Sequence, residues 1–128
     1  MKVSSYKDLE VWKKSMLLVT AVYSITKGFP KEETYGITNQ IRRASTSVPA
    51  NIAEGATRKS TKYYLQFLNI ARGSLAELET FLTISYNLNY ITDKDLNALT
   101  DHTEEIGKML NGLMNSLNKK LSITLTQA

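Results

Sequence analysis

The sequence predicts an all-α fold, an up-down-up-down antiparallel four-helix bundle whose second helix is kinked at Pro49, and three observations support this. Apolar residues recur at helical spacing almost throughout the 128 residues, and only two prolines, Pro30 and Pro49, occur among them. The turn clusters between periodic segments are few and short, which makes consecutive helices antiparallel neighbours. Hydrophobic residues form 42% of the chain, enough to bury a core, so we expect residues 1–128 to form one domain.

The first helix is expected over residues 6–26. Ser4 or Ser5 can cap its start, and acidic residues follow, where the helix dipole favours negative charge. Its apolar residues form two adjacent stripes, which are Leu9, Trp12, Met16, Val19 and Tyr23, and Val11, Leu18, Val22 and Ile25. An apolar face this wide predicts burial against more than one neighbour. Gly28 and Pro30 then end the helix.

The second helix is expected over residues 33–57. Its core stripe is Ile37, Ile41, Ala44, Val48 and Ile52. Pro49 lies inside it, and the proline ring removes the hydrogen bond to the Ser45 carbonyl and disfavours helical geometry at Val48. We expect a kink or a short break, with the hydroxyls of Ser45, Thr46 and Ser47 satisfying the freed backbone groups.

The third and fourth helices follow from the same periodicity. The third is expected over residues 61–87, with Ser60 or Thr61 as its cap. The fourth is expected over residues 93–120, and its apolar residues alternate steps of three and four from Leu96 to Leu117. This pattern is the seam of a helix that packs nearly parallel or antiparallel to a partner.

The composition argues against most enzymes and against metal or cofactor sites. The chain has no cysteine and one histidine, His102, so thiolate, zinc and di-iron sites lack their ligands. It has neither a Gly-x-Ser-x-Gly elbow nor a glycine-rich phosphate loop, and we assign no catalytic residue, metal or cofactor. A metal nuclease built only on the carboxylates of Glu54, Glu77 and Glu79 is the enzymatic alternative left open.

The start of the chain, MKVSSYKDLEVWKK, lacks the apolar run of a signal peptide. The most apolar window, residues 16–25, is too short to cross a bilayer. We therefore expect a soluble, cytoplasmic protein with no membrane partner.

A polar face lies beside the apolar stripe of the second helix. Helical spacing of four, three and four residues places these side chains on one side: Ser47, Asn51, Glu54 and Arg58. Small residues in the second and third helices favour close approach, and we predict a polar network that sets their register, made of Ser47, Asn51, Glu54, Ser74 and Glu77. Asn51→Ala or Glu54→Ala should then destabilise the protein by about 1–3 kcal/mol. The alternative is a ligand or subunit site built on the kink.

The charge is unevenly distributed along the chain. The net charge is +4, but residues 42–72 carry +5 and residues 73–118 carry −5. Clustered cations beside tyrosines, here Tyr63 and Tyr64, are typical of surfaces that bind phosphates and unpaired bases. The candidate nucleic-acid-binding residues are Arg42, Arg43, Arg58, Lys59, Lys62 and Arg72. The alternative is that these cations are simply solvated on helix surfaces.

Four motifs occur in order along the chain: YKDLEVW at residues 6–12, QIRRA at 40–44, SVPANIAEG at 47–55 and ARGSLAEL at 71–78. With them the chain resembles, over about residues 6–120, the bacterial four-helix bundle proteins encoded in intervening sequences of 23S ribosomal RNA genes. It is also similar, more distantly, to the accessory protein of diversity-generating retroelements. The family pattern falls here on residues without a transferable catalytic role, which are Asn51, Glu54, Gly55, Arg58, Gly73, Ser74 and Glu77.

The resemblance implies a four-helix bundle that assembles into a ring-shaped homopentamer. The retroelement relatives are basic and associate with reverse transcriptase and nucleic acid. The resemblance thus favours a non-enzymatic oligomer that binds RNA, the ribosome or a nucleic-acid-bound protein. The alternative is a protein-interaction scaffold that docks a partner through its ring, with no nucleic acid involved.

Overall fold

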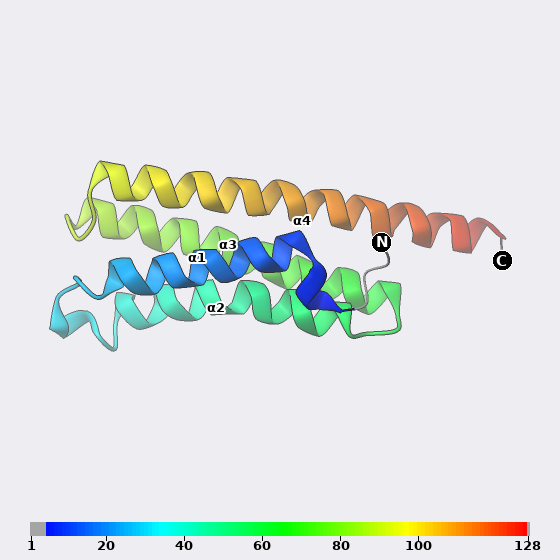
Figure 1. The fold of residues 1–128 in the computed structure, drawn as a ribbon, viewed down its shortest axis with the longest axis horizontal. Coiled ribbons are helices and arrows are strands. Elements are labelled where there is room, and N and C mark those ends of the chain that lie inside the picture. The colour runs from blue at the N-terminus through cyan, green and yellow to red at the C-terminus, as the bar shows by residue number, and fades with distance from the viewer. Residues whose placement is uncertain (1–4, 128) are drawn as a thin grey trace.

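The computed structural model describes residues 5–127 and the side chains of residues 5–123. Four helices lie side by side along one axis (Figure 1): α1 (Glu10–Thr26), α2 (Ile37–Ala56), α3 (Thr61–Asn87) and α4 (Asp93–Gln127). Each helix packs against the next along the chain, and α4 packs back against α1. The described residues contain no strand. The predicted all-α, up-down-up-down four-helix bundle is confirmed.

The first helix begins later than predicted. A 3-10 turn, η1 (Tyr6–Asp8), precedes it, and the Ser5 hydroxyl accepts a hydrogen bond from the backbone N–H of Lys7 at 3.2 Å. Leu9 is extended, with φ −72° and ψ 126°, so α1 starts at Glu10. Ser5 thus caps a turn, and the expected start of the helix at residue 6 is wrong. The turn brings the Tyr6 ring edge-on to that of Trp12, with centroids 5.4 Å apart.

The second helix also begins later than the expected residue 33. Lys31–Glu33 form another 3-10 turn, η2, and α2 starts at Ile37 after Gly36. The Glu33 carboxylate accepts hydrogen bonds from the Ile37 N–H at 3.5 Å and from the Tyr90 hydroxyl at 2.9 Å. Glu33 therefore caps α2 from outside and ties it to the α3–α4 connection.

Pro49 lies inside α2, and the helix runs through it without interruption. The expected short break is therefore wrong, while the kink stays a prediction. The Ser45 hydroxyl donates to the Arg42 carbonyl at 2.8 Å, and the Thr46 hydroxyl donates to the Arg43 carbonyl at 3.1 Å. Neither replaces the bond to the Ser45 carbonyl that the proline ring removes, so the expected compensation by these two hydroxyls is also wrong.

Hydroxyl caps mark the starts of the last two helices. The Ser60 hydroxyl accepts from the Tyr63 N–H at 3.3 Å at the start of α3. The Thr92 hydroxyl accepts from the Asp95 N–H at 3.1 Å at the start of α4. Between the helices Asn89 has a φ of 64°, a left-handed conformation that asparagine tolerates better than most residues. α4 continues to Gln127, beyond the expected end near residue 120.

One face of each helix packs into the hydrophobic core. Its fully buried large side chains are Leu18 and Val22 of α1, Ile41, Val48 and Ile52 of α2, Leu68, Leu78 and Leu82 of α3, and Ile106 and Leu110 of α4. The other predicted stripe of α1 lies nearer the surface, where Met16 is 42% and Tyr23 39% exposed. Since α2 and α4 are the helices that pack on α1 within the described chain, half of its wide apolar face stays outside the core.

The helices α2 and α3 approach closely at Gly55. A Cβ atom there would lie 2.9 Å from the Cβ of Phe67 and 3.2 Å from the Tyr64 carbonyl oxygen. Gly73, one of the small residues of the third helix, faces open space, with no atom within 4 Å of a Cβ position, and does not assist this approach. No helix within residues 5–127 combines the length and the apolar character that crossing a bilayer requires.

Candidate nucleic-acid interface

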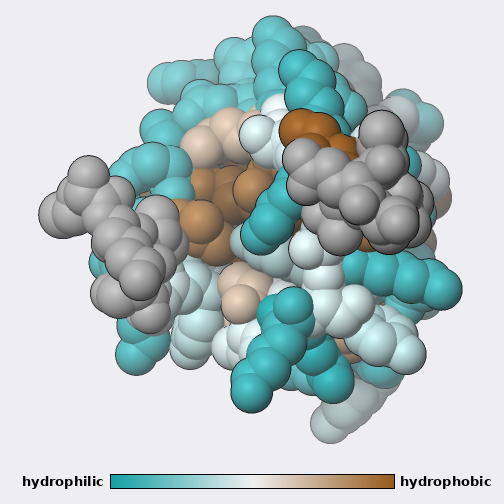
Figure 2. All heavy atoms as spheres, turned by 90° about the vertical axis from the view of Figure 1, so that its right-hand side faces the viewer, coloured by the Kyte–Doolittle hydropathy of each residue, from teal (hydrophilic) through white to brown (hydrophobic). Residues whose placement is uncertain are grey.

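Three of the candidate cations lie together at the α2–α3 corner. Arg58 and Lys59 are exposed in the short connection, and Lys62 is exposed on the first turn of α3. The Thr57 hydroxyl bonds the Glu54 carbonyl at 2.8 Å, which helps to close α2 just before them. Figure 2 looks onto this end of the bundle and shows hydrophilic residues around a smaller hydrophobic area.

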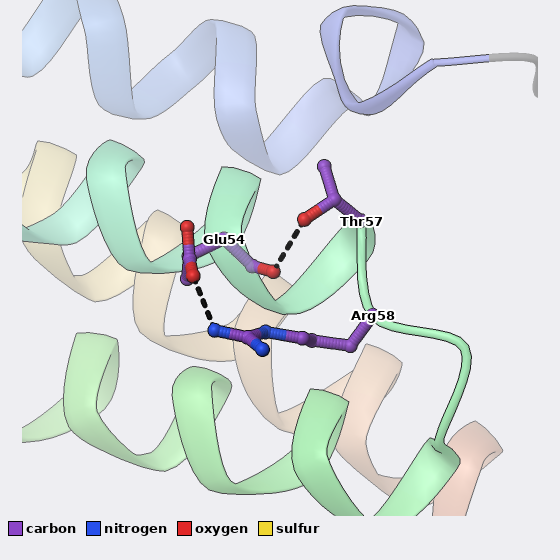
Figure 3. Close-up of polar contacts among 3 residues, drawn as sticks. All are labelled: Glu54, Thr57 and Arg58. Atoms are coloured by element: carbon purple, nitrogen blue, oxygen red, sulfur yellow. Dashed lines mark hydrogen bonds and ion pairs between the residues drawn. The ribbon is translucent and has the colours of Figure 1, made fainter.

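The charge of Arg58 is partly compensated at this corner. Its guanidinium forms an ion pair with the carboxylate of Glu54, one helical turn earlier (Figure 3). The guanidinium carbon also lies 5.0 Å from the centre of the Phe67 ring. About half of each charged side chain is exposed, so the pair contributes at most about 1 kcal/mol of stability. Glu54 thus pairs with Arg58 and not with the third helix.

A smaller polar network than predicted joins α2 to α3. The hydroxyls of Ser47 and Ser74 lie 2.8 Å apart, within hydrogen-bond distance. The Asn51 amide donates to the carbonyl and hydroxyl oxygens of Ser47, at 2.8 and 2.9 Å. Glu77 is exposed and has no hydrogen bond or ion pair with the described part of the chain. The structure therefore brings together three of the five predicted network residues and leaves Glu54 and Glu77 outside.

Arg72 points toward α4, away from the predicted network with α2. Its Nη1 donates to the Asn111 amide oxygen at 3.0 Å, and its Nη2 donates to the Asn69 amide oxygen at 2.7 Å. These bonds hold the guanidinium between two neutral groups on α3 and α4. The spacing of Asn69 and Arg72 indicates their proximity, whereas the contact with α4 depends on helix packing.

Arg42 and Arg43 lie near the start of α2, far from the α2–α3 corner at its end. The Arg42 Nε donates to the Thr26 hydroxyl at 2.9 Å, and its guanidinium lies over the Tyr23 ring, 4.6 Å from the centre. Arg43 is exposed. With a rise of about 1.5 Å per residue, the helix separates Arg42 from Ala56 by about 20 Å. The six candidate cations therefore do not form one patch.

The two neighbouring tyrosines have different surroundings. Tyr63 is 54% exposed beside the corner cations. Tyr64 packs against the core, and burial raises the pKa of its hydroxyl. Tyr63 is thus the one of the two that is open to solvent.

The carboxylates of the nuclease alternative do not gather. Glu79 accepts a hydrogen bond at 3.0 Å from the hydroxyl of the buried Thr103, while Glu54 is held by Arg58 and Glu77 is exposed. Within the described residues, no group of three or more His, Cys, Asp or Glu side chains could hold a metal ion. The sequence pattern did not indicate the Glu79–Thr103 bond, because it joins α3 to α4.

The charges separate along the bundle axis. We divide the bundle into two halves at the level of the Ser47–Ser74 contact, where Gly107 also faces Leu75. The half that contains the α2–α3 corner is called the basic half. Its described residues carry three carboxylates, Asp8, Glu10 and Glu54. They also carry ten cations: Lys7, Lys13, Lys14, Arg58, Lys59, Lys62, Arg72, Lys108, Lys119 and Lys120. The other half carries five cations and nine carboxylates.

An apolar groove follows the exposed stripe of α1. It has a volume of about 280 Å³ between α1 and α2, and its walls include Trp12, Met16 and Val19 on one side and Pro49 and Ala50 on the other. Pro49 is thus buried and contributes to a wall of this groove. Met16 and Ala50 are exposed here, so the groove leaves apolar side chains open to solvent.

Comparisons with known proteins agree with the fold and the motifs. The family model of the 23S rRNA-intervening sequence protein matches residues 7–112. A solved structure from Bacteroides thetaiotaomicron, described as a protein of unknown function from the S23 ribosomal protein family, has a TM-score of 0.77 and 27% sequence identity. That match covers 82% of this chain and 95% of the other. A search of curated proteins found no match.

The family match spans most of the chain and includes three of the four motifs in full and all of the first except Tyr6. The structure from Bacteroides thetaiotaomicron has the same bundle over nearly the whole of its own length. Neither description names a class of enzyme. The chain belongs to the family of 23S rRNA-intervening sequence proteins.

Proposed function

We propose that this protein is a non-enzymatic, oligomeric binding protein that associates with RNA or the ribosome in the cytoplasm. The family description, which names ribosomal RNA, supports an RNA-associated role. The observation that carries the proposal is the separation of charge along the bundle, with ten cations and three carboxylates among the described residues of the basic half. Such a surface attracts a polyanion and orients it toward one end of the molecule.

The α2–α3 corner is the proposed point of contact with phosphates. Arg58, Lys59 and Lys62 are exposed there, and Tyr63 offers a ring beside them. Cations bind phosphate oxygens and release counterions, so RNA binding should weaken steeply as salt is added. An exposed aromatic ring adds stacking with an unpaired base.

The apolar groove between α1 and α2 is the proposed surface for self-association. Its Trp12, Met16 and Ala50 side chains would be covered by another copy of the chain. A homo-oligomer would place several basic halves in one particle, and the resemblance implies that their number is five. Several such surfaces would bind one RNA molecule more tightly than a single one.

The test measures binding of the purified protein to structured ribosomal RNA, single-stranded RNA and duplex DNA at two salt concentrations. Light scattering on the same samples reports the oligomer mass. The corner variant Arg58→Glu/Lys59→Glu/Lys62→Glu should lose most binding to RNA. The matched control Lys27→Glu/Lys31→Glu/Arg43→Glu reverses three exposed cations in the other half and should keep it.

Two outcomes would count against this function. If both variants lose binding equally, the attraction is one of net charge and the corner has no special part. If the intact oligomer binds none of the nucleic acids near physiological salt, the scaffold alternative is favoured, and the apolar groove becomes the first place to seek a protein partner.

A further inference from the structure

A polar groove runs between the first half of α3 and the last half of α4. It has a volume of about 310 Å³, and its walls carry Lys62, Gln66, Asn69 and Arg72 from α3 and Asn118 from α4. Its apolar part is formed by Leu65 and Met114. The groove lies in the basic half and shares Lys62 with the α2–α3 corner.

The guanidinium of Arg72 is positioned in this groove without losing charge to a carboxylate. Both of its hydrogen bonds go to neutral amide oxygens, those of Asn69 and Asn111. In contrast, Arg58 is paired with Glu54, and Lys14 is paired with Glu105. A guanidinium held in place with its charge uncompensated binds phosphate well, since the ordering of the side chain is already complete.

The stretches of α3 and α4 that flank the groove carry no acidic residue. Residues 61–76 of α3 and 106–123 of α4 contain neither Asp nor Glu, although they contain five cations: Lys62, Arg72, Lys108, Lys119 and Lys120. A cationic or neutral peptide would find no charge partner here. An anion that also offers hydrogen-bonding groups matches the cations and amides together.

We propose that this groove binds a single-stranded segment of RNA, an inference that rests on the proposed RNA-binding function. Arg72 and Lys62 contact phosphates, and the amides of Gln66, Asn69 and Asn118 bond the edges of unpaired bases. Leu65 and Met114 supply an apolar floor for a base. Amides both donate and accept, as base edges do, whereas an A-form duplex hides most of these edges in a deep, narrow groove.

The first measurement follows the side-chain amide signals of ¹⁵N-labelled protein during titration with a single-stranded RNA of about ten nucleotides, a usual length for such sites. The signals of Gln66, Asn69 and Asn118 should shift. Those of Asn39 and Gln40, exposed at the start of α2 in the other half, should stay in place and serve as the internal control.

The second measurement compares affinities by fluorescence anisotropy. Arg72→Gln should weaken binding of the single strand about tenfold, while the matched variant Arg43→Gln changes it less than about twofold. Unchanged circular dichroism and thermal melting for both variants would show that they remain folded. The amide variant Asn69→Ala/Asn118→Ala should reduce the preference for single-stranded over duplex RNA without changing the net charge.

The outcomes separate this inference from the function on which it rests. If wild-type protein binds RNA, Arg58→Gln/Lys59→Gln abolishes binding, and Arg72→Gln binds like wild type, the corner is the site and the groove inference is wrong. If the groove amides stay unshifted at saturating RNA, the inference is likewise wrong and the function stands. If wild type binds no RNA, the function itself fails.

Discussion

Residues of the same type have different roles in this bundle because their neighbours differ. Arg58 is paired with a carboxylate, Arg72 is held by two amide oxygens, and Arg42 lies on a tyrosine ring. Arg42 and Arg72 each combine a fixed position with a charge that no carboxylate of the described residues compensates, and of these two only Arg72 lies in the basic half. The partner of Arg58 lies four residues away along the chain, whereas Arg42 meets Thr26 and Arg72 meets Asn111 through packing between helices.

Two glycines should respond in opposite ways to alanine. A Cβ at position 55 would lie 2.9 Å from Phe67 Cβ, so Gly55→Ala should destabilise the protein by about 1–3 kcal/mol through overpacking. Gly73→Ala meets no atom within 4 Å and should stabilise α3 by about 0.5–1 kcal/mol, because alanine favours the helix. Urea denaturation measures both. Equal effects of the two substitutions would contradict the close approach at Gly55.

At the scale of elements, α2 shows that packing against neighbouring helices can outweigh the helix-breaking effect of a proline. Pro49 lies in the middle of α2, where it removes a backbone hydrogen bond, yet the helix continues because its apolar face packs on α1 and α3. The polar contact between α2 and α3 is short and involves three side chains: Ser47, Asn51 and Ser74. Glu54, one turn further on, faces solvent and Arg58 instead.

The stability effects of Asn51→Ala and Glu54→Ala should therefore differ. Asn51→Ala removes both hydrogen bonds to Ser47 and should destabilise the protein by about 1 kcal/mol. Glu54→Ala removes a half-exposed ion pair and should change stability by less than about 0.5 kcal/mol. Thermal or urea unfolding of the two variants side by side measures this. A larger loss for Glu54→Ala would place that carboxylate in the network after all.

At the scale of the whole molecule, the antiparallel arrangement turns a difference along the chain into a difference between two ends. The basic residues 42–72 do not stay together, because Arg42 and Arg43 lie in the half that holds most carboxylates. In turn, the later part of α4, which carries Lys108, Lys119 and Lys120, lies at the same end of the bundle as the α2–α3 corner (Figure 1). Near the boundary Lys14 of α1 meets Glu105 of α4 at 2.9 Å.

This ion pair predicts a pH dependence of stability. The Lys14 ammonium lowers the pKa of Glu105, and the Glu105 carboxylate raises the pKa of Lys14. The stabilisation by the pair is therefore complete between the ordinary pKa values of 4.5 and 10.5. It is lost as pH falls through the lowered pKa of Glu105 or rises through the raised pKa of Lys14.

The melting temperature of Glu105→Gln, measured against wild type from acid to alkaline pH, checks this. The gap between the two proteins should be widest near neutral pH and close toward both extremes. Glu104→Gln, which removes an exposed carboxylate one residue away, is the control and should not reproduce this profile. A gap for Glu105→Gln that stays constant with pH would show that the pair does not contribute.

The sequence by itself determined the four helices, most of their buried faces and the family, because periodicity and propensity act within a few residues of one another. The range of α3 and its Ser60 cap follow from such local chemistry. The tertiary structure decided which residues from different helices meet: Arg72 with Asn111, Glu79 with Thr103, and Glu33 with Tyr90.

The late starts of α1 and α2 and the half-open face of α1 also depend on packing between segments distant in sequence. The separation of the candidate cations has the same origin. Arg42 and Arg58 lie close in the chain, but α2 holds Arg42 about 20 Å from Ala56, at the end of the helix next to Arg58. In contrast, antiparallel packing brings Arg72 and Asn111 into contact. Sequence spacing determines which face of a helix a residue occupies, and the bundle determines what that face meets.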